Sequence, residues 1–360
     1  MRDYVNPGGI ERVVAYKANY LVNMGHEVYI VSLFEKKGLP FFYFDPRIIF
    51  YNLNLADDKF INENFVEKLS SYFDKIKPDI ALSTGIGALN YLYKVRDSSK
   101  KILELHFAKY KKKYKLAKLD SFLLGRLITY VYSYKRTTIV SKYNAFVVLT
   151  DEDRLDWKGL NNIVTIPNPL SFVPASHSDL KTKRVIAIGR YTNQKGFDLL
   201  IDIWSKVNPY FPDWKLSFYG VGGKERRLKN QIKKLNLGAS IELNPPTKNV
   251  EEELNKSAIY AMPSRYEGFG LVLQEAMACG VPAVSFACKS GPRDIIHDGE
   301  DGFLVKMGNK EIFAEKLMLL MSNYNLRITM GEAARKNILR FSEDQIMAKW
   351  INLFDDLMKD

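Results

Sequence analysis

The sequence predicts an α/β protein built from two domains. Short apolar runs typical of buried strands alternate with segments whose apolar residues recur at helical spacing, and this alternation indicates parallel sheet units. At 360 residues the chain is longer than one hydrophobic core usually serves. A segment rich in Pro and Ser, 168–183, is the expected linker. We therefore expect one domain at 1–170 and another at 184–341.

The elements of the first domain follow from apolar spacing. Residues 10–24 carry apolar side chains at a helical period and are followed by Gly25, so they predict a helix that stops there. The other elements expected in this domain are strands at 26–34, 79–83, 102–105 and 145–149, a helix at 63–75, and a helix after a turn at 84–87.

The second domain shows the same alternation. The strands expected in it are 185–189, 215–220, 257–262 and 281–286, and the helices are 197–207, a basic helix at 224–236 and two helices within 310–340. The last twenty residues, from Phe341, also have a helical period.

Composition limits the kind of protein this can be. No apolar run is long enough to span a membrane, and the N-terminus lacks the apolar stretch of a signal peptide. Cys279 and Cys288 have no metal-ligand spacing and predict reduced core residues of a cytosolic protein.

Positive charge is concentrated in one segment. The net charge is +12, and between Lys94 and Lys142 there are 14 basic and 3 acidic residues, interleaved with Tyr and Phe. An anionic bilayer and a nucleic-acid backbone both attract such a segment. A solvated lysine-rich face that binds nothing is the alternative.

The segment 263–287 predicts a ligand site. It places Glu267 in a glycine-bracketed turn and Glu275 eight residues later, ahead of an apolar strand. The amides after Glu267 open a helix, where a phosphate or a sugar oxygen can bind. Two carboxylates suit neighbouring hydroxyls, because each can accept two hydrogen bonds. An N-cap acid followed by an ordinary surface Glu is the alternative. The amides belong to Gly268, Phe269 and Gly270.

Two cations follow a predicted strand that ends at Gly189. Arg190 and Lys195 lie in a loop leading into a helix, at the mouth of the predicted sheet. Fixed cations there can stabilise the negative charge that develops on a departing nucleoside diphosphate. Without that position, such a pair would be read as surface charge.

Two further features lie in the first domain. Gly8 and Gly9 precede a helix, so their backbone can approach a ligand closely with the helix dipole behind it, although a simple tight turn has the same spelling. His106 follows a strand and can hydrogen-bond a sugar hydroxyl from the carboxyl edge of the sheet, unless it is a packed structural residue.

Five motifs together resemble a known family. EGFGLVLQEAMACGVPAV resembles the E-x7-E segment of the retaining GT-B glycosyltransferases of family 4, which transfer a sugar from a nucleotide donor. Four other motifs agree in type and order, so that the likeness covers nearly the whole chain. They are GGIERV near the start, LHF at 105–107, IPNP at 166–169 and GRYTNQKGFDLLI at 189–201.

The resemblance implies a fold and roles for residues. The GT-B fold has two Rossmann-like domains whose parallel sheets face each other across a cleft, an acceptor-side domain first and a donor-binding domain second, with the terminal helix, 342–360, packed back on the first. By this resemblance the catalytic residues are Arg190, Lys195, Glu267 and His106. The donor-binding residues are Gly8, Gly9, Gly189, Gly268, Phe269, Gly270, Leu271 and Glu275.

Within these roles the two cations bind the diphosphate, Glu275 the ribose and Glu267 the transferred sugar. The resemblance implies front-face transfer, in which the leaving phosphate helps to deprotonate the acceptor. The sequence 151–153 has the D-x-D spelling of metal-dependent enzymes, but we interpret it as acid residues in the first turn of a helix and expect no metal or other cofactor. The loop 244–246 departs from the family pattern where the nucleobase should lie, so the base stays open.

The start of the chain also departs from the family. A buried strand should precede the glycine turn, and only MRDYVNP precedes Gly8. Loss of a central strand would leave both of its neighbours with an exposed edge. We therefore expect that the chain is truncated or mis-started.

The function expected is transfer of a hexose or N-acetylhexosamine from a nucleotide sugar, UDP-linked, to a glycan with a lipid-linked acceptor, in surface polysaccharide (capsule) biosynthesis. We expect a cytoplasmic protein whose segment 94–142 binds the anionic surface of the inner face of the cell membrane. We expect no nucleic acid as a partner. The alternatives are a sugar-nucleotide epimerase of the same fold and a non-catalytic protein that binds glycans or nucleic acid.

Overall fold

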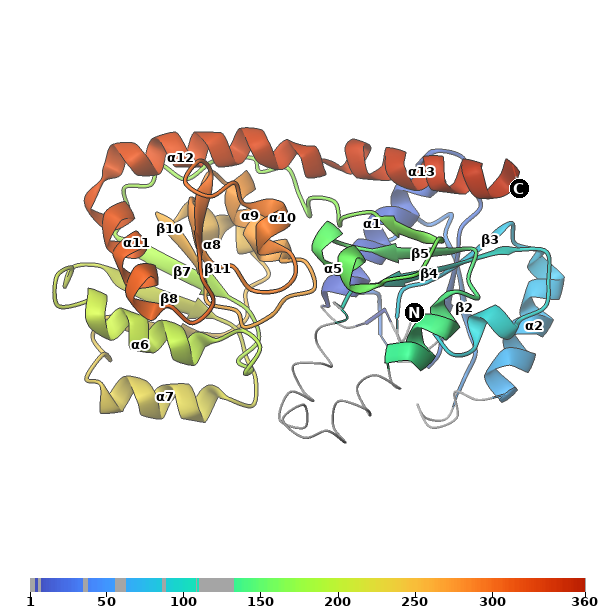
Figure 1. Cartoon of the computed structure of the whole chain (residues 1–360), viewed down its shortest axis with the longest axis horizontal. Coiled ribbons are helices and arrows are strands. Elements are labelled where there is room, and N and C mark those ends of the chain that lie inside the picture. The colour runs from blue at the N-terminus through green and yellow to red at the C-terminus, as the bar shows by residue number, and fades with distance from the viewer. Residues whose placement is uncertain are drawn as a thin grey trace. The chain divides into compact units, whose positions relative to one another are not determined.

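A computed structural model describes residues 4–5, 8–34, 38–55, 63–85, 89–107, 109 and 133–359. The chain forms two compact units (Figure 1). Unit 1 comprises Met1–Ser171 with Glu343–Asp360, and unit 2 comprises Phe172–Ser342. The passage from unit 1 to unit 2 therefore falls inside the segment 168–183 that the sequence suggests as a linker.

Unit 1 contains two parallel sheets. A four-stranded sheet has the order β3-β4-β5-β6, and β1 and β2 form a separate pair. Among the described residues β1 pairs only with β2 and β3 only with β4, so each has one edge without a strand partner. The strands are β1 (Tyr29–Ser32), β2 (Ile49–Asn52), β3 (Ile80–Ser83), β4 (Lys100–Leu105), β5 (Ala145–Val148) and β6 (Ile163–Thr165).

Helices cover these strands with apolar faces. The helix α1 (Gly9–Asn23) packs Val14, Ala18 and Val22 against Ile30 of β1. Other helical elements of unit 1 include α2 (Glu63–Ile76), the short 3-10 helix η2 (Leu92–Lys94), α5 (Asp151–Asp156) and α13 (Glu343–Lys359). The last of these comes from the end of the chain and buries Ile346, Met347 and Trp350.

Unit 2 has one parallel sheet of six strands in the order β12-β11-β10-β7-β8-β9. Its inner strands are continuous apolar runs, as expected for a parallel sheet covered on both faces. The strands are β7 (Arg184–Ile188), β8 (Lys215–Tyr219), β9 (Ile241–Asn244), β10 (Ile259–Met262), β11 (Ala283–Phe286) and β12 (Gly302–Val305).

Helices of unit 2 form two layers on this sheet. One layer contains α6, α7 and α11, and the other contains α8, α9 and α12 (Figure 1). Cys279 and Cys288 are both buried in this unit. The helices are α6 (Phe197–Val207), α7 (Glu225–Lys234), α8 (Val250–Asn255), α9 (Leu271–Ala278), α10 (Pro292–Ile295), α11 (Lys310–Ser322), α12 (Tyr324–Asn337) and the 3-10 helix η3 (Ile338–Phe341).

These elements confirm the predicted α/β class with parallel sheets in both units. Four strands, β2, β6, β9 and β12, have no counterpart in the sequence prediction. After the turn at 84–87, the described residues show the 3-10 helix η2 where the sequence predicts an α-helix.

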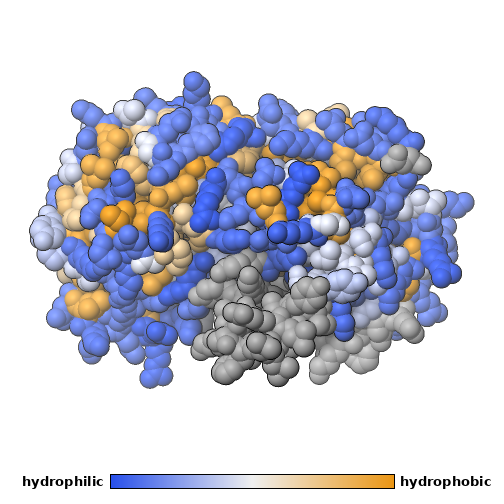
Figure 2. Space-filling model, viewed as in Figure 1, coloured by the Kyte–Doolittle hydropathy of each residue, from blue (hydrophilic) through white to orange (hydrophobic). Residues whose placement is uncertain are grey.

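The helices and the surface of the described residues bear on contact with a membrane. None of their helices has the length and apolar content that crossing a bilayer needs. Most of the face seen in Figure 2 is hydrophilic, with small apolar groups between the polar ones. Of the basic segment 94–142, residue 108 and residues 110–132 lie outside the described residues.

Candidate functional site

The loop after β7 brings a cation to the carboxyl end of the sheet in unit 2. Gly189 directly follows the strand, and a Cβ placed on it would lie 3.1–3.3 Å from the side chain of Lys195. The glycine thus allows the aliphatic part of Lys195 to cross the backbone closely. Arg190 is exposed beside it.

The far end of this loop is fixed by a second glycine. Gly196 has a φ of +68° and precedes α6, and a Cβ there would lie 2.0 Å from the carbonyl oxygen of Pro263. Only a residue without a Cβ allows this approach of the β7 loop to the end of β10. The sequence did not mark Gly196 as a site residue, although its role is to hold Lys195 in place.

Lys195 and Glu267, both predicted as catalytic, form an ion pair. Lys195 Nζ lies 2.7 Å from Glu267 Oε1, and the two side chains are 19% and 6% exposed. The hydroxyl of Ser264 donates a hydrogen bond of 2.5 Å to the same oxygen. Sequence reasoning missed Ser264, although a hydroxyl three residues before a carboxylate is a usable signal. The pair therefore sets a cation and a hydrogen-bonding carboxylate side by side.

The segment around Glu267 is held by its backbone. The Glu267 amide donates to the carbonyl of Lys289 at 2.8 Å, and a Cβ on Gly291 would lie 1.7 Å from the carbonyl oxygen of Phe269. Gly291 has a φ of +108°, a left-handed conformation that favours glycine. The segment of Glu267 and Phe269 thus contacts the segment of Lys289 and Gly291 through backbone atoms, and these contacts fix the position of the Glu267 backbone.

The predicted turn is the N-terminus of α9. Gly270 is its N-cap with a φ of +112°, and Leu271 is the first helical residue. Phe269 is buried with its ring 5.6 Å from that of Phe341, so its side chain belongs to the core and its backbone forms the turn. Gly268 lies before it and is partly exposed. The amides of this turn therefore remain our predicted oxygen-binding groups.

Glu275 lies one turn further along α9 and is 1% exposed. Burial raises the pKa of the Tyr260 phenol well above its ordinary value, and the charges of Glu267 and Glu275 raise it further. Both carboxylates therefore act electrostatically on the same residue of β10. Unit 2 brings Lys195, Glu267 and Glu275 to one end of its sheet.

A second ion pair, which the sequence analysis missed, braces the loop. Arg265 makes two bonds to Asp198 of α6, at 2.8 and 2.6 Å, and its backbone amide donates to the carbonyl of Gln194. Burial alone would raise the pKa of Asp198, but its bonds with Arg265 and the charge of Arg227 lower it. These contacts attach the segment after β10, which carries Glu267, to α6 and to the loop that carries Lys195.

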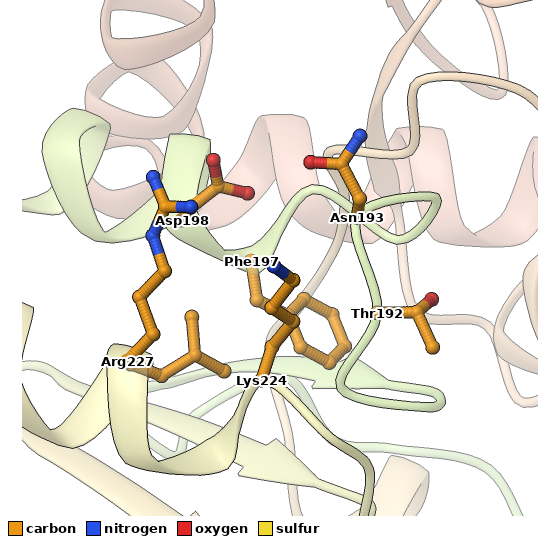
Figure 3. Close-up of a pocket in the computed structure, with 7 residues that line it drawn as sticks. Thr192, Asn193, Phe197, Asp198, Lys224 and Arg227 are labelled. Atoms are coloured by element: carbon orange, nitrogen blue, oxygen red, sulfur yellow. The ribbon is translucent and has the colours of Figure 1, made fainter. Parts of the chain in front are cut away.

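A small cavity lies beside this brace (Figure 3). None of the predicted site residues lines it. Arg227 extends toward Asp198 there (Figure 3). The residues that line it are Thr192, Asn193, Phe197, Asp198, Lys224, Arg227 and Leu228.

Gly8 and Gly9 of unit 1 lie at the N-terminus of α1, Gly8 as N-cap and Gly9 as first residue. A Cβ on Gly8 would lie 1.9 Å from Oε2 of Glu11. The carboxylate of Glu11 thus lies at the positive end of the helix, which it stabilises. An anion that binds these amides must move the Glu11 side chain.

His106 follows β4 and is 8% exposed. Its Nε2 lies 3.4 Å from Oε2 of Glu104, and the same oxygen accepts a hydrogen bond of 2.5 Å from Nζ of Lys17. Burial alone would raise the pKa of Glu104, but Lys17 and His106 lower it to about 2. The sequence analysis singled out neither Lys17 nor Glu104.

The D-x-D segment is the first turn of α5. Thr150 caps this helix by accepting the amide of Asp153 at 3.0 Å, as the interpretation of these acids as helix-start residues requires. Burial raises the pKa of Asp153 to about 6. Across the described ranges no group of three His, Cys, Asp or Glu side chains is arranged to hold a metal ion.

Comparisons with known proteins agree with this architecture. A family model, Glycosyl transferases group 1, matches residues 172–337. An uncharacterized glycosyltransferase of Haemophilus influenzae is 30% identical over 351 residues, which cover 95% of each chain. The chain belongs to the glycosyl transferases group 1 family. The predicted family is therefore confirmed, and glycosyl transfer is the activity of its class.

One further relative and one solved structure have names that mention substrates or products. Amylovoran biosynthesis glycosyltransferase AmsD of Erwinia amylovora is 29% identical over an alignment of 370 positions, which covers 97% of each chain. A mutant of S. aureus TarM, solved in complex with Fondaparinux, alpha-GlcNAc-glycerol and UDP, has a TM-score of 0.68 and 26% identity. That match covers 80% of this chain and 58% of TarM.

Proposed function

We propose that this protein is a retaining, metal-independent glycosyltransferase that moves a hexose or N-acetylhexosamine from a UDP-sugar to a glycan on a lipid-linked acceptor, in surface polysaccharide biosynthesis. The observation that carries the proposal is the contact between Lys195 and Glu267 at the carboxyl end of the unit 2 sheet. It places a cation for a diphosphate beside a carboxylate for a sugar hydroxyl.

The chemistry follows from these two groups. As the bond between sugar and diphosphate breaks, negative charge grows on the phosphate oxygens, and Lys195 with Arg190 can stabilise it. Glu267, held by Ser264, then accepts from hydroxyls of the sugar. Glu275 is assigned to the ribose and His106 to the sugar or the acceptor. Catalysis in this scheme is positioning and charge stabilisation.

The comparisons support the donor and the product class. UDP is bound in the TarM structure, and AmsD acts in amylovoran biosynthesis. Contact of 94–142 with an anionic membrane at its cytoplasmic face stays our prediction, tested by co-sedimentation with anionic vesicles at moderate salt.

Release of UDP tests the proposal. A transferase usually loses some donor to water, so the protein should release UDP from one of UDP-glucose, UDP-galactose or UDP-N-acetylglucosamine, with EDTA present. The Lys195→Ala variant should lose at least about 100-fold of this release, because one charged group at the leaving oxygen contributes several kcal/mol. Lys206→Ala, which removes a surface lysine paired with Glu311 in the same unit, should keep it.

The same assay separates the alternatives. An epimerase would yield a second UDP-sugar and no UDP, and a non-catalytic binding protein would release nothing from any donor. Either result, obtained with a protein that a thermal-shift screen shows to bind the donor, would contradict the proposal.

A further inference from the structure

His106 lies in a buried charged network that spans three elements of unit 1. Glu104 of β4 is 1% exposed, Lys17 of α1 is 6% exposed and His106 is 8% exposed. Lys17 Nζ donates to Glu104 Oε2 at 2.5 Å, and it also lies 4.1 Å from the centre of the Trp350 ring. Trp350, which is 1% exposed, comes from α13 at the other end of the chain.

Stability alone is a weak reason for such a network. Removing an ion pair from water costs several kcal/mol, and well-packed apolar residues of similar volume are often as stable or more so. Lys17 lies on the buried side of α1, near Val13, Val14 and Ala18, where an apolar side chain would fit the pattern of the helix. The charges therefore suggest a role for their neighbour.

That neighbour is the imidazole of His106. Its Nε2 is buried, finds no hydrogen bond of good geometry within the described residues, and lies 3.4 Å from the Glu104 oxygen that Lys17 also contacts. Hydrogen bonds of catalytic groups are often long without substrate and shorten when it binds. A carboxylate at this position favours a proton on Nε2, which leaves Nδ1 as the ring nitrogen that can accept a hydrogen bond from a ligand.

We propose that Glu104 is a positioning residue that holds the proton of neutral His106 on Nε2, and that Lys17, covered by Trp350, is the counter-charge that keeps Glu104 ionised in the core. In this arrangement the C-terminal helix α13 supports the site in unit 1 through one aromatic ring. The kinetic consequence rests on the proposed function, whereas the state of the ring does not.

The test variant removes both charges together. Lys17→Met with Glu104→Gln keeps similar volumes and leaves neither charge buried alone, so the fold should be retained. The matched control is Lys101→Met with Asp97→Asn. Lys101 of β4 and Asp97, which precedes the strand, also form a buried ion pair, with side chains 7% and 10% exposed. Because side chains alternate along a strand, Lys101 lies on the opposite face of β4 from Glu104.

Nitrogen NMR of the imidazole rings reads the proton position directly. The chain has four histidines, and His106→Gln identifies the signal. In mildly alkaline buffer the wild type and the control should show His106 protonated at Nε2, and the Lys17→Met/Glu104→Gln variant should show exchange between both nitrogens. The same ring state in that variant and in the wild type would overturn the proposal.

Kinetics provide the second readout. In the double variant we expect kcat for UDP release to fall about 10–100-fold, the size typical of lost orientation, with KM for the donor changed less than about threefold. The control should keep kcat. An unchanged kcat in the double variant would overturn the positioning role. If the wild type releases no UDP from any donor, the proposed function is refuted, and the NMR result still decides whether Glu104 fixes the ring.

Discussion

Replacing Lys195 with Met leaves the buried carboxylate of Glu267 with the Ser264 hydroxyl as its remaining side-chain partner among the described residues. At 2.7 Å and an effective dielectric constant of about 20, the attraction lost is about 6 kcal/mol before desolvation is counted. Breaking a fully buried pair costs about 3–5 kcal/mol. Because the Lys195 side chain is 19% exposed and water can replace it in part, we expect a loss of about 2 kcal/mol.

A double-mutant cycle isolates this contribution. In a Glu267→Gln background no charge is left unpaired by Lys195→Met, so that substitution should cost less than about 1 kcal/mol and the coupling should be about 1–2 kcal/mol. Urea unfolding of the full chain, followed by hydrogen exchange in peptides from β7 and β10, reports the free energy of opening of unit 2 alone. Costs that add within about 0.3 kcal/mol would refute the reasoning.

Two other substitutions test the loops and the burial of an acid. Gly291→Ala should lower stability by about 3 kcal/mol or more and abolish the thermal shift with UDP, because its Cβ would lie 1.7 Å from the Phe269 carbonyl. Gly299 has a φ of +82° and no atom within 4 Å of an added Cβ, so Gly299→Ala should cost only about 1 kcal/mol. Equal melting temperatures of the Gly291→Ala and Gly299→Ala variants would contradict the role of Gly291. For Asp153, burial raises the pKa from 3.8 to about 6, so the folded state holds a proton that the unfolded chain has released. The free energy of unfolding should therefore fall by on the order of 3 kcal/mol as pH rises from about 4 to about 7, and Asp153→Asn should flatten this slope in pH-dependent urea unfolding. An equal slope in both proteins would show that this carboxyl is not the cause.

The sequence predicts those elements of the fold whose pattern of apolar residues lies within the element itself. The strand predicted at 185–189 was found as β7, because a short continuous apolar run between polar residues is typical of a strand buried on both faces of a parallel sheet. The helix predicted at 197–207 was found with the same bounds, because apolar residues at helical spacing follow the left-handed Gly196. In contrast, β2 exposes Ile49, Phe50 and Tyr51, so its apolar residues do not alternate in the way that marks a half-buried strand.

The site divides in the same way. The sequence located Lys195 and Glu267, since each lies beside glycines at the end of a predicted strand, and the structure adds that they form an ion pair. The contact between Lys17 and Glu104 joins residues 87 positions apart, and neither has a local signal. A lysine in an amphipathic helix is ordinarily read as solvated, and only packing against α13 shows that this one is buried.

Calorimetric titration with UDP and with uridine tests the central claim, that unit 2 holds a diphosphate through Arg190 and Lys195. Both ligands carry the same base and ribose, so their difference isolates the phosphates. We predict that Lys195→Ala and Arg190→Ala each weaken UDP binding at least about tenfold, about 1.4 kcal/mol, and leave uridine binding unchanged. Affinity for UDP that is unchanged, or that falls only in step with that for uridine, would contradict the account.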